Sequence, residues 1–133
     1  MRYPVVIHKD NGSEYGVTVP DLQGCFSAGT TMDNALENAE ESIECHLEGM
    51  LLDGEKIPLA GSIEKHRKNR EYKNGTWALI NIDLSKLSGK AKRINITLPE
   101  NILSQVDQYA QTHGESRSGL LAQAAIEYIS IHH

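Results

Sequence analysis

The strongest constraint on the fold lies in residues 92–133, where a short alternating segment precedes two short helical patterns. Apolar and polar side chains alternate over residues 92–98, as they do in a β-strand with one buried face. The apolar positions are Ile94, Ile96 and Leu98, and the polar positions are Arg93, Asn95 and Thr97. A lone strand leaves its backbone edges unpaired, so the pattern predicts that this strand pairs with its copy in a second chain.

The two helical patterns predict a pair of helices joined by a tight turn. Pro99 fits the first turn of one helix, Gly114 fits its end, and Ser116 is a candidate N-cap for the next. Apolar residues recur at three- and four-residue spacing, at Ile102, Leu103, Val106, Tyr109 and Ala110 and then at Leu120, Leu121, Ala124, Ala125, Tyr128 and Ile129. About forty residues bury too little surface to fold alone, which also predicts a dimer.

The polar face of the predicted strand suits the edges of DNA bases. Arg93 can hold guanine with two hydrogen bonds, Asn95 can hold adenine with two, and Thr97 offers a hydroxyl and a methyl group. A two-stranded ribbon built from two chains fits the major groove. A plain exposed strand face is the alternative interpretation. Residues 90–133 carry four basic and four acidic side chains, so overall charge does not decide between the two.

Residues 92–130 resemble the ribbon–helix–helix DNA-binding family. The resemblance rests on the order of a basic alternating strand, a Pro-initiated helix, a Gly-containing turn with Ser116-Arg117-Ser118, and a second helix. It implies an obligate dimer whose strands pair antiparallel in the major groove and contact bases through Arg93, Asn95 and Thr97. It also implies phosphate contacts near the start of the second helix, which favours anions, from Lys92, Ser116, Arg117 and Ser118.

Residues 1–89 differ in both charge and pattern. They carry 9 Lys and Arg against 14 Asp and Glu, which favours a basic protein partner over nucleic acid. Three strands come first, then a helix capped by Thr30 or Thr31 and ended near Gly54, then a polar loop with a helical turn and a fourth strand. The expected strands are Arg2–His8, Tyr15–Val19, Cys25–Ala28 and Trp77–Ile82, and the loop covers residues 62–72. Trp77 is expected in the core.

Residues 1–83 look similar to the N-terminal domain of HicB antitoxins. The run Tyr15–Gly29 carries this resemblance, with its break at Pro20-Asp-Leu-Gln-Gly-Cys25 between two strands, followed by Asn34–Ala39. The two resemblances imply an α+β fold, in which a partial, degenerate ribonuclease H-like β-β-β-α-β domain precedes a β-α-α ribbon–helix–helix domain. The first resemblance also implies binding to a HicA toxin, a small basic mRNA-cleaving protein whose catalytic His becomes masked.

The expected organisation is a toxin-neutralising domain over residues 1–83, a linker rich in Ser, Gly and Lys over 84–91, and a DNA-binding domain over 92–133. The expected function is that of a type II antitoxin, which inhibits a HicA-like toxin and represses its own operon at operator DNA. Its expected assembly is a homodimer through the C-terminal domain, with a tetramer left open. The expected location is the cytoplasm, without a membrane span.

Other functions have less support in the sequence. A metal-dependent nuclease needs carboxylates on the first strand, whose centre is Val5-Val6-Ile7-His8, and no His or Cys pair has metal-ligand spacing. The chain is therefore not expected to be an enzyme or to hold a metal or cofactor. Cys25 and Cys45 are expected to be buried thiols. A ribbon–helix–helix regulator whose front domain senses a small ligand stays open as an alternative.

Overall fold

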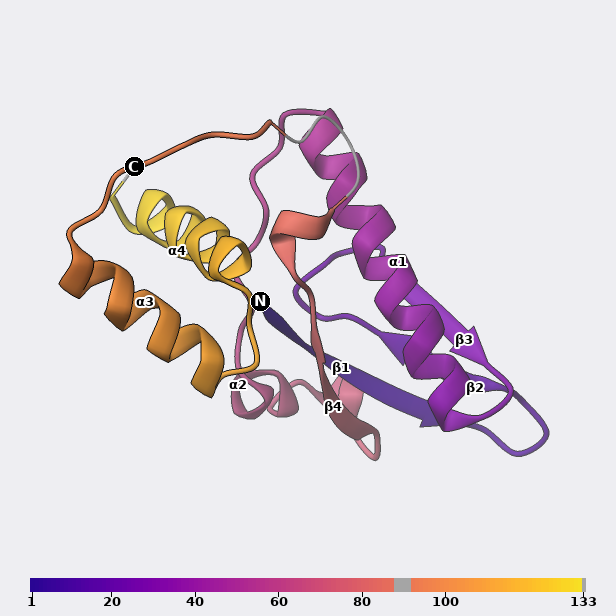
Figure 1. Cartoon of the computed structure of the whole chain (residues 1–133). Coiled ribbons are helices and arrows are strands. Elements are labelled where there is room, and N and C mark those ends of the chain that lie inside the picture. The colour runs from indigo at the N-terminus through magenta and orange to yellow at the C-terminus, as the bar shows by residue number, and fades with distance from the viewer. Residues whose placement is uncertain (88–91, 133) are drawn as a thin grey trace. The chain divides into compact units, whose positions relative to one another are not determined.

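The computed structural model of the chain describes residues 1–87 and 92–132. They form two units, which meet in the sequence between Ile82 and Asp83 (Figure 1). The first contains an antiparallel four-stranded sheet with helices, and the second contains helices, so the predicted α+β class is confirmed. Among the described residues, no helix is both long and apolar enough to cross a membrane.

The first unit follows the predicted order of three strands, a long helix and a fourth strand. Its strands have the spatial order β3-β2-β1-β4, and β1 pairs antiparallel with both β2 and β4. Two short helices, α2 and the 3-10 helix η1, occupy the region where a polar loop with a helical turn is expected. The elements are β1 (Arg2–Lys9), β2 (Tyr15–Thr18), β3 (Phe26–Gly29), α1 (Met32–Leu52), α2 (Ile63–Arg67), η1 (Arg70–Tyr72) and β4 (Thr76–Asn81).

Helix α1 packs across the sheet through one narrow apolar stripe. Thr31 caps the helix, because its Oγ1 accepts a hydrogen bond from the backbone N–H of Asn34 at 3.0 Å. The helix contacts β2, β3 and β4, and its buried residues are Ala35, Ala39, Ile43 and Leu47. A Cβ at Gly29 would collide with the backbone of Ala35, so the close approach of β3 to the start of α1 requires glycine.

Buried side chains of the first unit come mainly from β1 and α1, with further ones from the segment between β2 and β3, at Val19, Leu22 and Cys25. Trp77 is only half-buried, so its expected place in the core is wrong. The physical reason is that β4 is an edge strand of the sheet, with a neighbouring strand on one side only. The indole stacks on His66, with 6.5 Å between ring centroids, and meets Tyr72 edge-on at 5.7 Å.

The two cysteines have different surroundings. Cys25 is buried and Cys45 is exposed, and both are free thiols. The expectation of buried thiols is therefore confirmed for Cys25 and wrong for Cys45. Burial raises the pKa of the Cys25 thiol, which keeps it protonated and unreactive at neutral pH.

The second unit begins with a 3-10 helix and continues with two α-helices, namely η2 (Leu84–Lys86), α3 (Glu100–Thr112) and α4 (Arg117–His132). Leu84 is buried and η2 contacts α4. Residues 84–86, expected in a linker, therefore fold with the second unit, because the apolar side chain of Leu84 is buried in that unit. Residues 88–91 of the expected linker lie outside the described residues, as does His133.

Candidate functional site

The predicted strand over residues 92–98 has no secondary structure in the single chain. Among the described residues, none of its backbone groups forms a hydrogen bond. A strand is defined by its pairing, and a single chain offers no second copy of the segment. Base contacts are predicted for Arg93, Asn95 and Thr97. All three side chains are exposed, so no other described residue covers them.

Large apolar side chains lie on the surface of the second unit. Ile94 is 70% exposed and Ile96 is 60% exposed, although the alternation predicts that both face a core. Exposed apolar residues also lie on the two helices, at Ile102, Tyr109, Tyr128, Ile129 and Ile131. These seven exposed large apolar side chains belong to a unit of 51 residues, and such residues suit a surface that another protein covers.

The start of α4 brings together three of the four predicted phosphate-contacting residues, Ser116, Arg117 and Ser118. Ser116 is the predicted N-cap, which is confirmed because its Oγ accepts a hydrogen bond from the N–H of Gly119 at 2.9 Å. Lys92, the fourth residue, lies in the unpaired segment before α3, and no contact in the described chain joins it to the other three.

The carboxylate of Asp83 lies against the same helix start. Its Oδ2 accepts a hydrogen bond from Ser116 Oγ at 2.9 Å, and its Oδ1 accepts from the N–H and the Oγ of Ser85 at 3.0 and 2.6 Å. Burial raises the pKa of Asp83, but the hydrogen bonds from Ser85 and Ser116 outweigh burial and hold the pKa below its usual value. Asp83 therefore carries its negative charge at neutral pH.

Arg117 is also held by a carboxylate of its own unit. Its Nε and Nη2 donate to Oδ1 and Oδ2 of Asp107, each at 2.8 Å, in a bidentate pair. The hydrogen bond from Arg117 lowers the pKa of Asp107. Both side chains are exposed, so solvent screens the pair and its guanidinium stays close to the surface.

No local pattern in the sequence predicts that Asp83 and Asp107 lie at the start of α4. Asp83 is 33 residues from Ser116 in the sequence, and Asp107 is ten residues from Arg117 across the turn between two helices. Neither separation matches the three- or four-residue spacing that brings side chains together on one helix. The one local signal is Gly119, which is unusual inside a helix and which here leaves room for Asp83.

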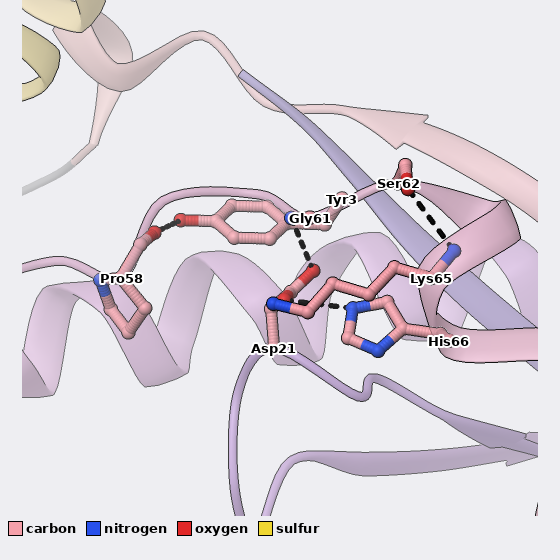
Figure 2. Close-up of polar contacts among 7 residues, drawn as sticks. All are labelled: Tyr3, Asp21, Pro58, Gly61, Ser62, Lys65 and His66. Atoms are coloured by element: carbon pink, nitrogen blue, oxygen red, sulfur yellow. Dashed lines mark hydrogen bonds and ion pairs between the residues drawn. The ribbon is translucent and has the colours of Figure 1, made fainter. Parts of the chain in front are cut away.

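In the first unit, Asp21 joins segments that are distant in the sequence (Figure 2). Its Oδ2 accepts a hydrogen bond from the N–H of Gly61 at 2.9 Å, and its Oδ1 lies 2.9 Å from Nε2 of His66. Tyr3 donates to the carbonyl of Pro58 at 2.8 Å, and burial, followed by the charge of Asp21, raises the pKa of Tyr3. These contacts tie the segment between α1 and α2 to the sheet, so the cluster supports the fold. Among the described residues, no group of three or more His, Cys, Asp or Glu could hold a metal ion.

Outside its buried face, α1 carries a stripe of acidic residues, which are exposed at Glu37, Glu40 and Glu41 and half-buried at Glu44 and Glu48. Burial, together with the charges of Glu40, Glu48 and Glu41, raises the pKa of Glu44. Like charges four residues apart destabilise a helix by about 0.2–0.5 kcal/mol per pair. The helix therefore carries these charges although they lower its stability. An acidic surface of this kind is complementary to a basic partner.

Comparisons with known proteins agree with this architecture. Residues 3–125 match the model of the HicB-like antitoxins of bacterial toxin–antitoxin systems. An uncharacterized 14.9 kDa protein from the rep–hol intergenic region of Haemophilus phage HP1 is 46% identical over 127 residues, which cover 94% of this chain and 95% of that protein. The crystal structure of the Burkholderia pseudomallei antitoxin HicB superposes with a TM-score of 0.79 at 42% identity, covering 96% of this chain and 98% of the other.

A chain of the HicA3 and HicB3 toxin–antitoxin complex is also similar. It superposes with a TM-score of 0.55 at 29% identity and covers 62% of this chain and 99% of its own length. The family match spans both units and most of the sequence. This chain therefore belongs to the HicB-like antitoxin family of bacterial toxin–antitoxin systems, which confirms the resemblance of its front half to HicB antitoxins.

Proposed function

We propose that this chain is a type II antitoxin, which binds and inhibits a HicA-like mRNA-cleaving toxin and represses its own operon at operator DNA. The observation that carries the proposal is the antitoxin family match over residues 3–125, which spans both units. In this proposal the first unit, a degenerate ribonuclease H-like domain, binds the toxin. The second unit dimerises as a ribbon–helix–helix and contacts DNA, and the chain acts by binding and not by catalysis.

Toxin binding by the first unit has two supports. The similar chain in the HicA3 and HicB3 complex covers 62% of this chain, a share as large as the first unit. The acidic stripe of α1 provides charge complementarity for a basic toxin, which steers association and favours the correct partner.

DNA binding by the second unit is supported by the unpaired backbone and the exposed apolar side chains of the segment before α3. The backbone of residues 92–98 is unpaired, and Ile94 and Ile96 are exposed, so pairing with a second copy would satisfy both the backbone and the apolar side chains. In the resulting ribbon, Arg93, Asn95 and Thr97 would contact bases. Phosphate contacts would come from Lys92, Ser116, Arg117 and Ser118, at a helix start that favours anions.

The first unit is expected to inhibit the toxin without the second. A fragment of residues 1–82 should block RNA cleavage by the purified toxin as fully as the whole chain does, because the fragment keeps the sheet and the acidic helix. The same fragment should not bind the DNA upstream of its gene. If a folded fragment, checked by circular dichroism, leaves RNA cleavage unchanged, the assignment of toxin binding to this unit is wrong.

The acidic stripe is expected to contribute to toxin affinity. Replacing four of its glutamates by glutamine, at Glu40, Glu41, Glu44 and Glu48, should weaken toxin binding by roughly tenfold and flatten its dependence on salt. The variant should also melt at a higher temperature, because the repulsion among these glutamates, which adds to burial in raising the pKa of Glu44, is gone.

A matched control neutralises four acidic residues elsewhere in the first unit, at Asp10, Glu14, Asp53 and Glu55. It changes the net charge by the same amount and should alter toxin affinity much less. Equal losses in the two variants, measured by titration calorimetry at two salt concentrations, would show that only net charge matters and that the α1 stripe is not the contact surface.

A further inference from the structure

We propose that Asp83 is an internal competitor for DNA phosphate, because its carboxylate is held beside the start of α4 by the Ser116 cap and its charge lowers the affinity of the second unit for all DNA. The proposal rests on the proposed DNA-binding function, because it concerns the helix start to which phosphate contacts are assigned above. It adds to that surface a residue that lowers DNA affinity, and this residue comes from the segment that joins the two units in the sequence.

The start of α4 attracts anions. The first turn of a helix presents unpaired N–H groups and partial positive charge, which favour an anion. Ser116 accepts from the N–H of Gly119, while the N–H groups of Arg117 and Ser118 have no partner among the described residues. The Asp83 carboxylate, hydrogen-bonded to Ser116 Oγ at 2.9 Å, places a negative charge beside this helix start without accepting from those two N–H groups.

Gly119 and Ser85 keep the carboxylate there. Glycine inside a helix is less stable than alanine. At Gly119 an added Cβ would lie 2.6 Å from Asp83 Oδ1 and 3.0 Å from Ser116 Oγ, so only glycine leaves room for the carboxylate. On the other side, Ser85 donates two hydrogen bonds to Oδ1. The position of Asp83 is thus fixed both by the helix and by η2.

DNA phosphate would meet this carboxylate. A phosphate arriving at the same helix start would lie close to a carboxylate of like charge, and the two charges would repel each other. Either Asp83 moves away or the contact is weakened. Phosphate contacts do not depend on sequence, so the loss applies equally to operator and to other DNA. Asp107 acts in the same sense, because its bidentate pair with Arg117 must open before that guanidinium can meet phosphate.

Two substitutions remove the competitor in different ways. Asp83→Asn keeps the shape and an acceptor oxygen but removes the charge. Gly119→Ala keeps the charge but forces the carboxylate away, and alanine favours the helix, so this variant stays informative if Asp83→Asn folds poorly. Glu127→Gln is the control for net charge, because Glu127 is an exposed acid of α4 far along the helix from its start.

The test is DNA binding by fluorescence anisotropy, using the full chain, a duplex from the region upstream of its gene, and a scrambled duplex, with circular dichroism to check folding. We expect both variants to bind both duplexes roughly tenfold more tightly at low salt, with an unchanged ratio between the duplexes, a gain that shrinks at high salt and no change in Glu127→Gln. Folded variants that bind no tighter than a parent that does bind would overturn the proposal and leave Asp83 a structural tether. If neither the parent nor the variants bind either duplex, the DNA-binding function fails and this proposal fails with it.

Discussion

Ile96→Lys is expected to abolish dimerisation of the second unit and all DNA binding. Ile96 is 60% exposed in the single chain, and the alternation of residues 92–98 places it on the face that pairing with a second copy would bury. Burying an unpaired ammonium group costs several kcal/mol, and a two-fold dimer would contain two of them. Sedimentation equilibrium should show the mass of a single chain, and operator binding should disappear at any practical concentration.

Thr97→Lys is the matched control, because it adds the same side chain to the opposite face of the same segment. It should remain dimeric, although its base preference should change. The Ile96→Lys protein should still inhibit the toxin, since the first unit has its own core. An Ile96→Lys chain that keeps the parent's mass and DNA affinity would show that this face is not the dimer core.

Arg93→Ala and Asn95→Ala are expected to remove operator selectivity while leaving the dimer folded. Each bidentate base contact is worth about 1–3 kcal/mol, and a two-fold symmetric dimer makes each contact twice. Each variant should therefore lose about 2–6 kcal/mol of the free energy of operator binding. Binding to scrambled DNA should change much less. Anisotropy titrations on both duplexes, with circular dichroism and sedimentation, separate loss of base contacts from loss of folding.

Arg117→Ala provides the contrast within the same surface. Its proposed contact is to phosphate, so the substitution should weaken operator and scrambled DNA by the same factor and reduce the salt dependence. The loss should be small, because Arg117 is already paired with Asp107 and gains less from a new anion. If folded Arg93→Ala and Asn95→Ala proteins bind the operator as tightly and as selectively as the parent, the segment serves only for dimerisation.

Local patterns in the sequence predict most of the first unit. The three strands, the Thr31-capped helix and the fourth strand depend on alternation, turn residues and capping, all of which act over a few residues. These local patterns do not predict the burial of Trp77, because that burial depends on the position of β4 at the edge of the sheet. Strand order comes from long-range pairing, which residue patterns within one strand do not encode.

The candidate site is only partly visible in the sequence for the same reason. The Ser116 cap is local and was predictable, since its partner Gly119 is three residues away. Pairing of residues 92–98 requires a second chain, and Asp83 reaches Ser116 only through the folding of η2 against α4. The contacts of Asp83 with Ser116 and of Asp107 with Arg117 therefore come from the tertiary structure and not from a motif.

In the function that we propose, this chain neutralises an RNA-cleaving toxin. The most direct measurement is RNA cleavage by the product of the neighbouring gene, purified alone and after co-purification with this chain, with the mass of the complex from light scattering. We predict that the isolated partner cleaves RNA, that the two proteins co-purify as a defined complex, and that cleavage stops in that complex. A partner that does not associate with this chain and cleaves RNA at the same rate in its presence would contradict the account.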